Sequence, residues 1–143
     1  MNETVAAGPM ASVRPELRAT AVSIAVGRAV LRRVVTFRDP DAESSFLIAF
    51  TEIMTNAVDE HVRLASDRPI VVEIEQTPHD LVRVNDSGAG MSDESLVTSA
   101  PDGSVERGRG LALARAFVDD IAFESSPSGT IVSLPLAGFG IIR

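Results

Sequence analysis

The sequence predicts an α+β fold, a two-layer α/β sandwich in which a mixed, mostly antiparallel sheet is covered by helices on one face. Two strand-like segments, residues 69–76 and 80–86, are separated only by a short turn, and a second such pair covers 121–125 and 130–136. Strands joined by short turns form antiparallel hairpins. Long helical patterns precede the first hairpin, and another separates the two hairpins. This order is not the strand–helix alternation of a doubly wound sheet.

The first half of the chain contains one strand-like and two helix-like segments. Residues 16–23 suit an edge strand, and residues 23–37 place apolar side chains at helical spacing with arginines on the other face. Residues 41–67 follow a helical pattern and predict one long helix. Residues 1–15 have no clear period and predict a flexible N-terminal arm, ahead of a single domain over residues 16–143.

The second half begins with the first predicted hairpin. Residues 87–107 are then polar, glycine-bearing and aperiodic, and a stretch of that length inside a compact domain is often a lid, here over 91–107. Residues 109–121 predict a helix opened by the sequence GRG. The strands 121–125 and 130–136 close the fold.

Composition and charge exclude several functional classes. The formal net charge is −7, whereas binding to nucleic acid or to anionic lipid requires clustered basic residues. Cysteine is absent, which excludes disulfides, a thiolate nucleophile and thiolate zinc sites. No apolar run reaches the roughly 20 residues needed to cross a bilayer. We therefore expect a cytoplasmic protein that binds neither nucleic acid nor membrane.

The long predicted helix carries a short polar stripe. At about 100° per residue, Asn56 lies about 40° from Glu52 and Asp59 about 20° to its other side, so the three share one face, with apolar residues opposite or to one flank. One interpretation is an ordinary solvated face. The other is a carboxylate–amide pair that acts on a ligand.

Two glycine-containing stretches can likewise be interpreted either as ordinary local structure or as parts of a ligand-binding site. The strand 80–86 ends in Asp86, followed by Gly88 and Gly90, which either form a plain turn or let a planar ligand approach while Asp86 accepts a hydrogen bond from it. The sequence GRGL, residues 108–111, opens a helix, where free N–H groups favour an anion such as phosphate. Neither stretch is a P-loop or a dinucleotide-binding fingerprint.

The order of these stretches resembles the GHKL (Bergerat) ATP-binding family. E-x-x-x-N at 52–56 is followed by D-x-G-x-G at 86–90, G-x-G-L at 108–111 and GT before the last strand. The resemblance extends from about residue 20 to residue 136. Because no phosphoacceptor histidine lies in the helix before residue 52, the chain is most similar to the stand-alone anti-sigma factor serine/threonine kinases of bacteria.

The resemblance implies a role for each matching residue. Glu52 would be the general base and Asn56 the ligand of Mg²⁺, which bridges the phosphates of ATP. Asp86 would accept from the adenine amino group. Other ATP-binding residues would surround these groups: Gly88 and Gly90 beside the base, Gly108, Arg109, Gly110 and Leu111 at the phosphates, and Thr130 near adenine.

The implied function is phosphorylation of an anti-anti-sigma (STAS-type) partner by ATP, together with sequestration of a sigma factor in transcriptional regulation and stress response. A nucleotide-dependent switch or scaffold without kinase activity, and a plain ATPase, stay open as alternatives. We expect a homodimer, because residues 19–26 and the helix after them carry surplus apolar surface. Asp59 either orients Asn56 or is solvated, and His61 is expected on the surface.

Overall fold

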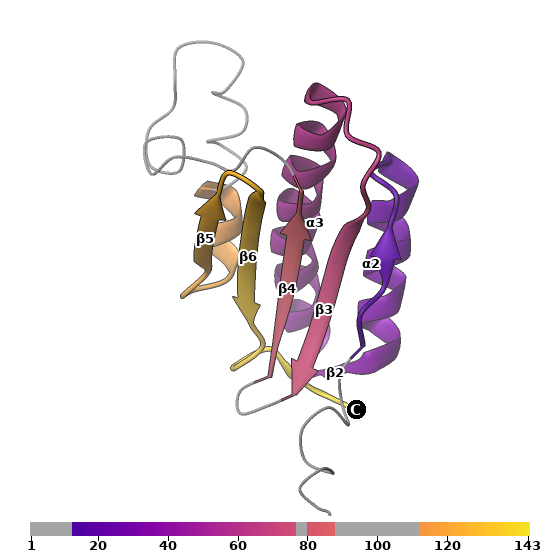
Figure 1. Cartoon of the computed structure of the whole chain (residues 1–143). Coiled ribbons are helices and arrows are strands. Elements are labelled where there is room, and N and C mark those ends of the chain that lie inside the picture. The colour runs from indigo at the N-terminus through magenta and orange to yellow at the C-terminus, as the bar shows by residue number, and fades with distance from the viewer. Residues whose placement is uncertain (1–12, 77–79, 88–111) are drawn as a thin grey trace, which may run out of the picture.

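The computed structural model describes residues 13–76, 80–87 and 112–143, and every structural statement below concerns these residues (Figure 1). In chain order the elements are β1 (Glu16–Leu17), α2 (Ala21–Val34), β2 (Val35–Phe37), α3 (Pro40–Arg63), β3 (Ile70–Gln76), β4 (Asp80–Asp86), a short helix over 112–117, β5 (Ala122–Ser126), β6 (Gly129–Pro135) and β7 (Gly140–Ile142).

The main sheet has five strands in the order β1-β3-β4-β6-β5, and each neighbouring pair is antiparallel. Both predicted hairpins are present, as β3 with β4 and β5 with β6. The strand β4 lies at the centre and aligns Asp86 with Thr130 of β6. Figure 1 shows α2, α3 and the short helix on one face of this sheet. The predicted α+β sandwich is confirmed.

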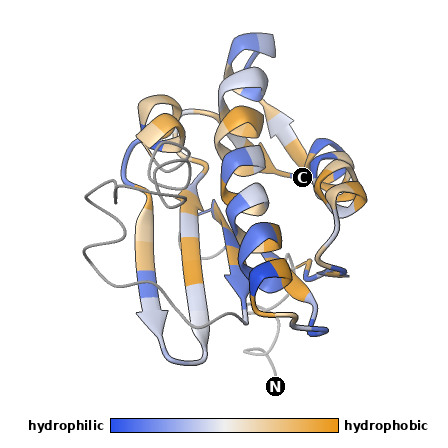
Figure 2. Ribbon diagram, turned by 90° about the horizontal axis from the view of Figure 1, so that it is seen from above, coloured by the Kyte–Doolittle hydropathy of each residue, from blue (hydrophilic) through white to orange (hydrophobic). Residues whose placement is uncertain are grey.

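The core lies between the sheet and the helices. Alternate residues of the central strands are buried, as in Ile70, Val72 and Ile74 of β3, because successive side chains point to opposite faces. They pack against the apolar side of α3, where Phe46 and Phe50 are fully buried. Each such side chain contributes about 1.5–3 kcal/mol through burial. Figure 2 shows that hydrophobic and hydrophilic residues recur along the same helices, which are therefore amphipathic.

The outer face of the sheet is polar. Arg14 forms an ion pair with Glu73 at 2.9 Å, and Arg83 one with Glu75 at 2.5 Å. Burial raises the pKa of Glu73, but the hydrogen bonds from Arg14 and Asn85 and the charges of Arg14 and Arg83 together leave this pKa below its usual value. One face of the sheet thus meets the core and the other meets solvent.

The chain joins this sheet before residue 16. Val13 exchanges two backbone hydrogen bonds with Ile74, and the N–H of Val72 donates to the carbonyl of Pro15 at 3.0 Å. The last residues of the expected flexible arm are therefore held against β3, and residues 1–12 lie outside the described part of the chain.

Several predicted element boundaries are wrong. The strand expected over 16–23 ends at Leu17, because Thr20 takes the extended backbone of an N-cap and α2 starts at Ala21. The next predicted helix ends at Val34 rather than at residue 37. There β2 pairs with β7 in a second, two-stranded antiparallel sheet that the sequence analysis did not predict. The helix expected over 109–121 is described only over 112–117.

Candidate functional site

The helix α3 positions two of the predicted site residues. Asp39 caps its N-terminus by accepting a hydrogen bond from the N–H of Ala42 at 2.7 Å, and proline at the first helical position suits this start. This backbone hydrogen bond and the guanidinium of Arg38 lower the pKa of Asp39. The cap supports a helix that runs without interruption past Glu52 and Asn56.

Glu52 and Asn56 are one turn apart and both are half-buried. They lie at the edge of the buried face of α3, where the neighbouring Ile53 and Ala57 are buried. The side-chain nitrogen of Asn56 is buried and has no hydrogen-bond partner among the described residues. Since nearly all buried polar groups in native proteins are paired, this amide calls for an explanation.

Asn56 lies on the flank of α3 that faces away from α2. Arg28 of α2 donates to the hydroxyl of Thr51 at 2.7 Å, which identifies the flank nearer α2. Asn56 is five residues later, about 140° round the helix from Thr51. Figures 1 and 2 both show α3 between α2 and the helix over 112–117. Asn56 is therefore on the side of α3 toward that short helix, which follows the sequence GRGL.

Asp86 and Thr130 meet at the end of the central strand. The N–H of Thr130 donates to Oδ1 of Asp86 at 3.2 Å, and Thr130 is buried. Because Val84 is buried two residues before Asp86, the side chain of Asp86 points to the same, helix-covered face. The hydroxyl of Thr130 is 3.5 Å from that of Ser125 on β5. Two predicted site residues from distant parts of the sequence are thus brought into direct contact.

Gly129 makes this contact possible, and the sequence analysis did not single it out. Its φ is +147°, and a Cβ placed there would lie 2.0 Å from the carbonyl oxygen of Asp86. Only glycine allows the start of β6 to approach Asp86 this closely. The available signal was the GT pair after the SPS turn, from which only Thr130 was selected.

His61 is fully buried, so the prediction of a surface histidine is wrong. Its Nε2 accepts a hydrogen bond from the N–H of Ser87 at 2.9 Å, and its Nδ1 is 3.1 Å from the carbonyl oxygen of Arg68. The imidazole therefore connects the last turn of α3 with the chain on both sides of the β3–β4 hairpin. A histidine near a helix end gives no sequence signal for such contacts.

The residues just before His61 differ sharply in exposure. Asp59 is exposed and makes no hydrogen bond to the amide nitrogen of Asn56, which favours a solvated role. Glu60 is only 3% exposed and forms an ion pair with Arg63 at 2.6 Å, and this pairing raises the pKa of Arg63. The burial of Glu60 was not predicted from the sequence.

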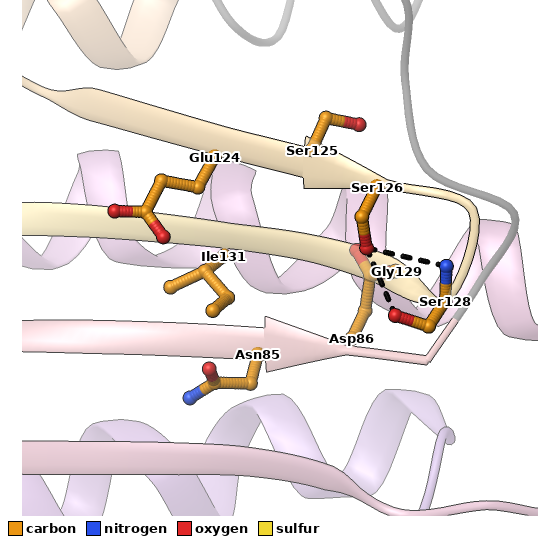
Figure 3. Close-up of a pocket in the computed structure, with 8 residues that line it drawn as sticks. All are labelled: Asn85, Asp86, Glu124, Ser125, Ser126, Ser128, Gly129 and Ile131. Carbon is orange, nitrogen blue, oxygen red and sulfur yellow. Dashed lines mark hydrogen bonds between the residues drawn. The ribbon is translucent and has the colours of Figure 1, made fainter.

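The pocket at Asp86 opens on the outer face of the sheet (Figure 3). Its volume is about 310 Å³, and its lining includes Asn85, Glu124 and Ile131 in addition to Asp86. Figure 3 shows Ser126 bonded to Ser128 at its rim, at 2.8 Å between their hydroxyls. Of the predicted site residues, Asp86 lines this pocket, whereas Glu52 and Asn56 do not. The predicted residues Gly88, Gly90, Gly108, Arg109, Gly110 and Leu111 lie outside the described residues.

The side chains available as ligands determine how a metal ion could be bound. Across residues 13–76, 80–87 and 112–143, no group of three or more His, Cys, Asp or Glu side chains is arranged to hold a metal ion. Asn56 nevertheless fits Mg²⁺, which prefers oxygen ligands and is often bound by one or two side chains plus substrate phosphates. The two ends of a side-chain amide are assigned from their partners. Because the side-chain nitrogen of Asn56 has no partner among the described residues, the amide can be flipped so that its oxygen takes the place of the nitrogen and is available to Mg²⁺. None of the described helices is long and apolar enough to span a membrane.

Comparison with known proteins identifies the domain type. A family model described as a histidine kinase-like ATPase domain matches residues 13–136. The fold is similar to part of the crystal structure of the RsbU and RsbW domains of Rv1364c from Mycobacterium tuberculosis, with 21% identity and a TM-score of 0.59, covering 87% of this chain and 31% of that chain. A second similar structure is the SiaB–SiaC complex from Pseudomonas aeruginosa, at 13% identity and a TM-score of 0.49, covering 92% of this chain and 89% of that one. No curated protein matches the sequence significantly.

Proposed function

Because the chain belongs to the histidine kinase-like ATPase domain family, whose members are ATP-binding domains, we propose that it is a serine/threonine protein kinase acting as an anti-sigma factor. In this proposal it moves the γ-phosphoryl group of ATP to a hydroxyl of an anti-anti-sigma, STAS-type partner. It also sequesters a sigma factor while that partner is phosphorylated.

The observation that carries the proposal is the unpaired amide of Asn56. It is buried at the edge of the α3 core, on the flank toward the short helix, and its nitrogen has no partner among the described residues. Leaving a buried polar group unpaired costs about 1–3 kcal/mol, which a bound ligand would recover. Asn56 would hold Mg²⁺ together with the phosphates. Mg²⁺ would neutralise phosphate charge when bound.

Glu52 would act as the general base. It is half-buried and one turn before Asn56, so its carboxylate shares the flank on which we place the phosphates. In the transfer step the partner hydroxyl oxygen bonds to the γ-phosphorus, the bond to the bridging oxygen of ADP breaks, and Glu52 takes the hydroxyl proton. A pure binding module has no need of this carboxylate.

Asp86 and Thr130 would recognise the adenine base. The bond from Thr130 N–H fixes Oδ1 of Asp86, and the buried position of Thr130 at the end of β6 keeps this arrangement rigid. A fixed carboxylate at the end of a central strand suits the adenine amino group, which is a hydrogen-bond donor. The glycines at 88–90 and 108–110, which lie outside the described residues, would lie beside the base and the phosphates in this proposal.

The fold likeness to a structure that contains an RsbW domain supports the proposed partner, and so does charge. Phosphorylation adds about −1.5 to −2 charges to a hydroxyl-bearing surface. The chain itself carries a formal net charge of −7. Repulsion and desolvation would therefore favour release of the phosphorylated partner and leave the kinase able to bind a sigma factor.

Glu52→Gln tests the catalytic step, with Asp59→Asn as the matched control. Both variants remove one carboxylate from the same helix, but Asp59 is exposed and lies nearer the helix end. With γ-labelled ATP, Mg²⁺ and STAS-type substrates, we expect Glu52→Gln to reduce transfer at least 100-fold, in the range typical of general bases. It should keep ADP affinity within about threefold, and Asp59→Asn should keep both properties.

Other outcomes identify the alternatives. Labelled inorganic phosphate released without labelled partner would indicate a plain ATPase. ATP binding with neither product, together with unchanged partner regulation in Glu52→Gln, would indicate a switch. Equal losses of transfer in both variants would contradict the role of Glu52.

A further inference from the structure

We infer that His61 is a positioning residue for adenine recognition, because it fixes the chain where it leaves β4 directly after Asp86. The inference rests on the proposed function, since it concerns the base-binding end of the same site. His61 belongs to the last turn of α3 and is fully buried. Its two ring nitrogens contact two chain segments that flank the β3–β4 hairpin.

The hydrogen bonds define the state of the imidazole. Ser87 donates its N–H to Nε2 at 2.9 Å, so Nε2 carries no proton. In a neutral ring the proton is then on Nδ1, which donates to the carbonyl oxygen of Arg68 at 3.1 Å. One side chain thereby meets a backbone donor and a backbone acceptor, in the single tautomer that serves both.

These contacts fix the backbone on either side of Asp86. On the β6 side, Thr130 N–H holds the carboxylate of Asp86 at 3.2 Å. On the α3 side, His61 holds the N–H of Ser87 and hence the peptide plane that follows Asp86. Contacts from two elements therefore hold this end of β4: α3 holds the peptide that follows Asp86, and β6 holds the Asp86 carboxylate.

Two conservative substitutions separate the ring nitrogens. The terminal amide of Gln reaches about as far as Nε2 of His, and that of Asn about as far as Nδ1. His61→Gln therefore keeps an acceptor for Ser87, whereas His61→Asn keeps a donor for Arg68 and leaves the Ser87 N–H unpaired. Both variants remove the ring, and Asn leaves the larger cavity because it is one methylene smaller than Gln, so the ADP/IDP ratio rather than stability is the deciding readout.

The readout is discrimination between bases, measured by calorimetry with ADP and with IDP, which has an oxo group where adenine has its amino group. We expect His61→Asn to bind ADP about tenfold more weakly, about 1.4 kcal/mol, with IDP binding nearly unchanged, so that the ADP/IDP ratio falls. His61→Gln should keep this ratio within about twofold of wild type. Equal melting temperatures in the two variants with unchanged ratios would show a purely structural role and overturn the inference.

A measurement on the unmodified protein keeps the test decisive if His61→Asn fails to fold. The sequence has two histidines, His61 and His79, so their ¹⁵N resonances can be assigned with a single His79→Gln variant. We expect a protonated Nδ1 and an unprotonated Nε2 on His61, both without nucleotide and with ADP. A proton on Nε2 would overturn the inference. Wild-type protein that binds neither ADP nor ATP would instead refute the proposed function.

Discussion

Gly129→Ala is the substitution for which the structure gives the most definite expectation. The added Cβ would lie 2.0 Å from the carbonyl oxygen of Asp86 and 3.1 Å from Cα of Ser87. Real Cβ atoms essentially never come closer than 3.0 Å, so β6 and the end of β4 must separate by at least about 1 Å. Because both neighbours are backbone, no side-chain rotation relieves the contact.

The magnitude follows from two effects at this position. A φ of +147° is strained for alanine, at about 1–3 kcal/mol, and overpacking a fixed neighbour costs about 1–3 kcal/mol. One backbone shift relieves part of both, so we expect a loss of about 2–4 kcal/mol in the free energy of unfolding. At roughly 4 °C per kcal/mol for a domain of this size, the melting temperature should fall by about 8–16 °C.

Gly138→Ala provides the matched control. Its φ is +86°, and a Cβ there meets nothing within 4 Å, so it carries backbone strain without a clash. We expect a loss of only about 1 kcal/mol from this variant. Thermal melting gives the stability difference, and calorimetry with ADP gives the second readout, because only Gly129→Ala displaces Asp86 from Thr130. Equal stability losses in the two variants, or unchanged ADP affinity in Gly129→Ala, would refute this reasoning.

Two further predictions concern the helices. Asp39→Ala should lower stability at neutral pH through loss of the N-cap. Because the folded pKa of Asp39 is lowered below 3.8, its stabilisation is present above that value and is lost as pH falls through the folded pKa. Melting curves of wild type and variant should therefore converge at acid pH, and a constant gap would count against the cap. Val22→Asp should convert a homodimer to a monomer in light scattering, because Val22 is 72% exposed on α2. Val62→Asp should leave the oligomeric state unchanged, because Val62, 67% exposed, lies on α3 rather than α2. A monomeric wild type would exclude the dimer.

The hairpins and the long helix were predictable because their signals are local. Alternation in β3 and β4 and the helical spacing from Phe46 to Val58 arise from burial on one side, which the sequence records directly. The same spacing placed Glu52, Asn56 and Asp59 on one polar face, and in the structure Glu52 and Asn56 are half-buried whereas Asp59 is exposed. The family resemblance supplied the roles of these residues, which periodicity alone does not.

The features that were missed depend on partners far along the chain. The three-residue strand β2 exists because it pairs with β7, and neither is long enough to show a pattern. The burial of His61 depends on Ser87 and Arg68, which flank the β3–β4 hairpin and are distant from His61 or from each other along the chain. Gly129 is required because Asp86 lies beside it, a contact created by the β4–β6 register.

The central place of β4 has a consequence for how the domain opens. β4 is bonded along its length to β3 on one side and β6 on the other, whereas β5 has one partner in the described part of the chain. Fluctuations that peel β5 away from β6 leave the β4–β6 ladder in place, and with it the pairing of Asp86 with Thr130. The proposed contact between Asp86 and adenine would then persist while β5 is transiently detached from β6.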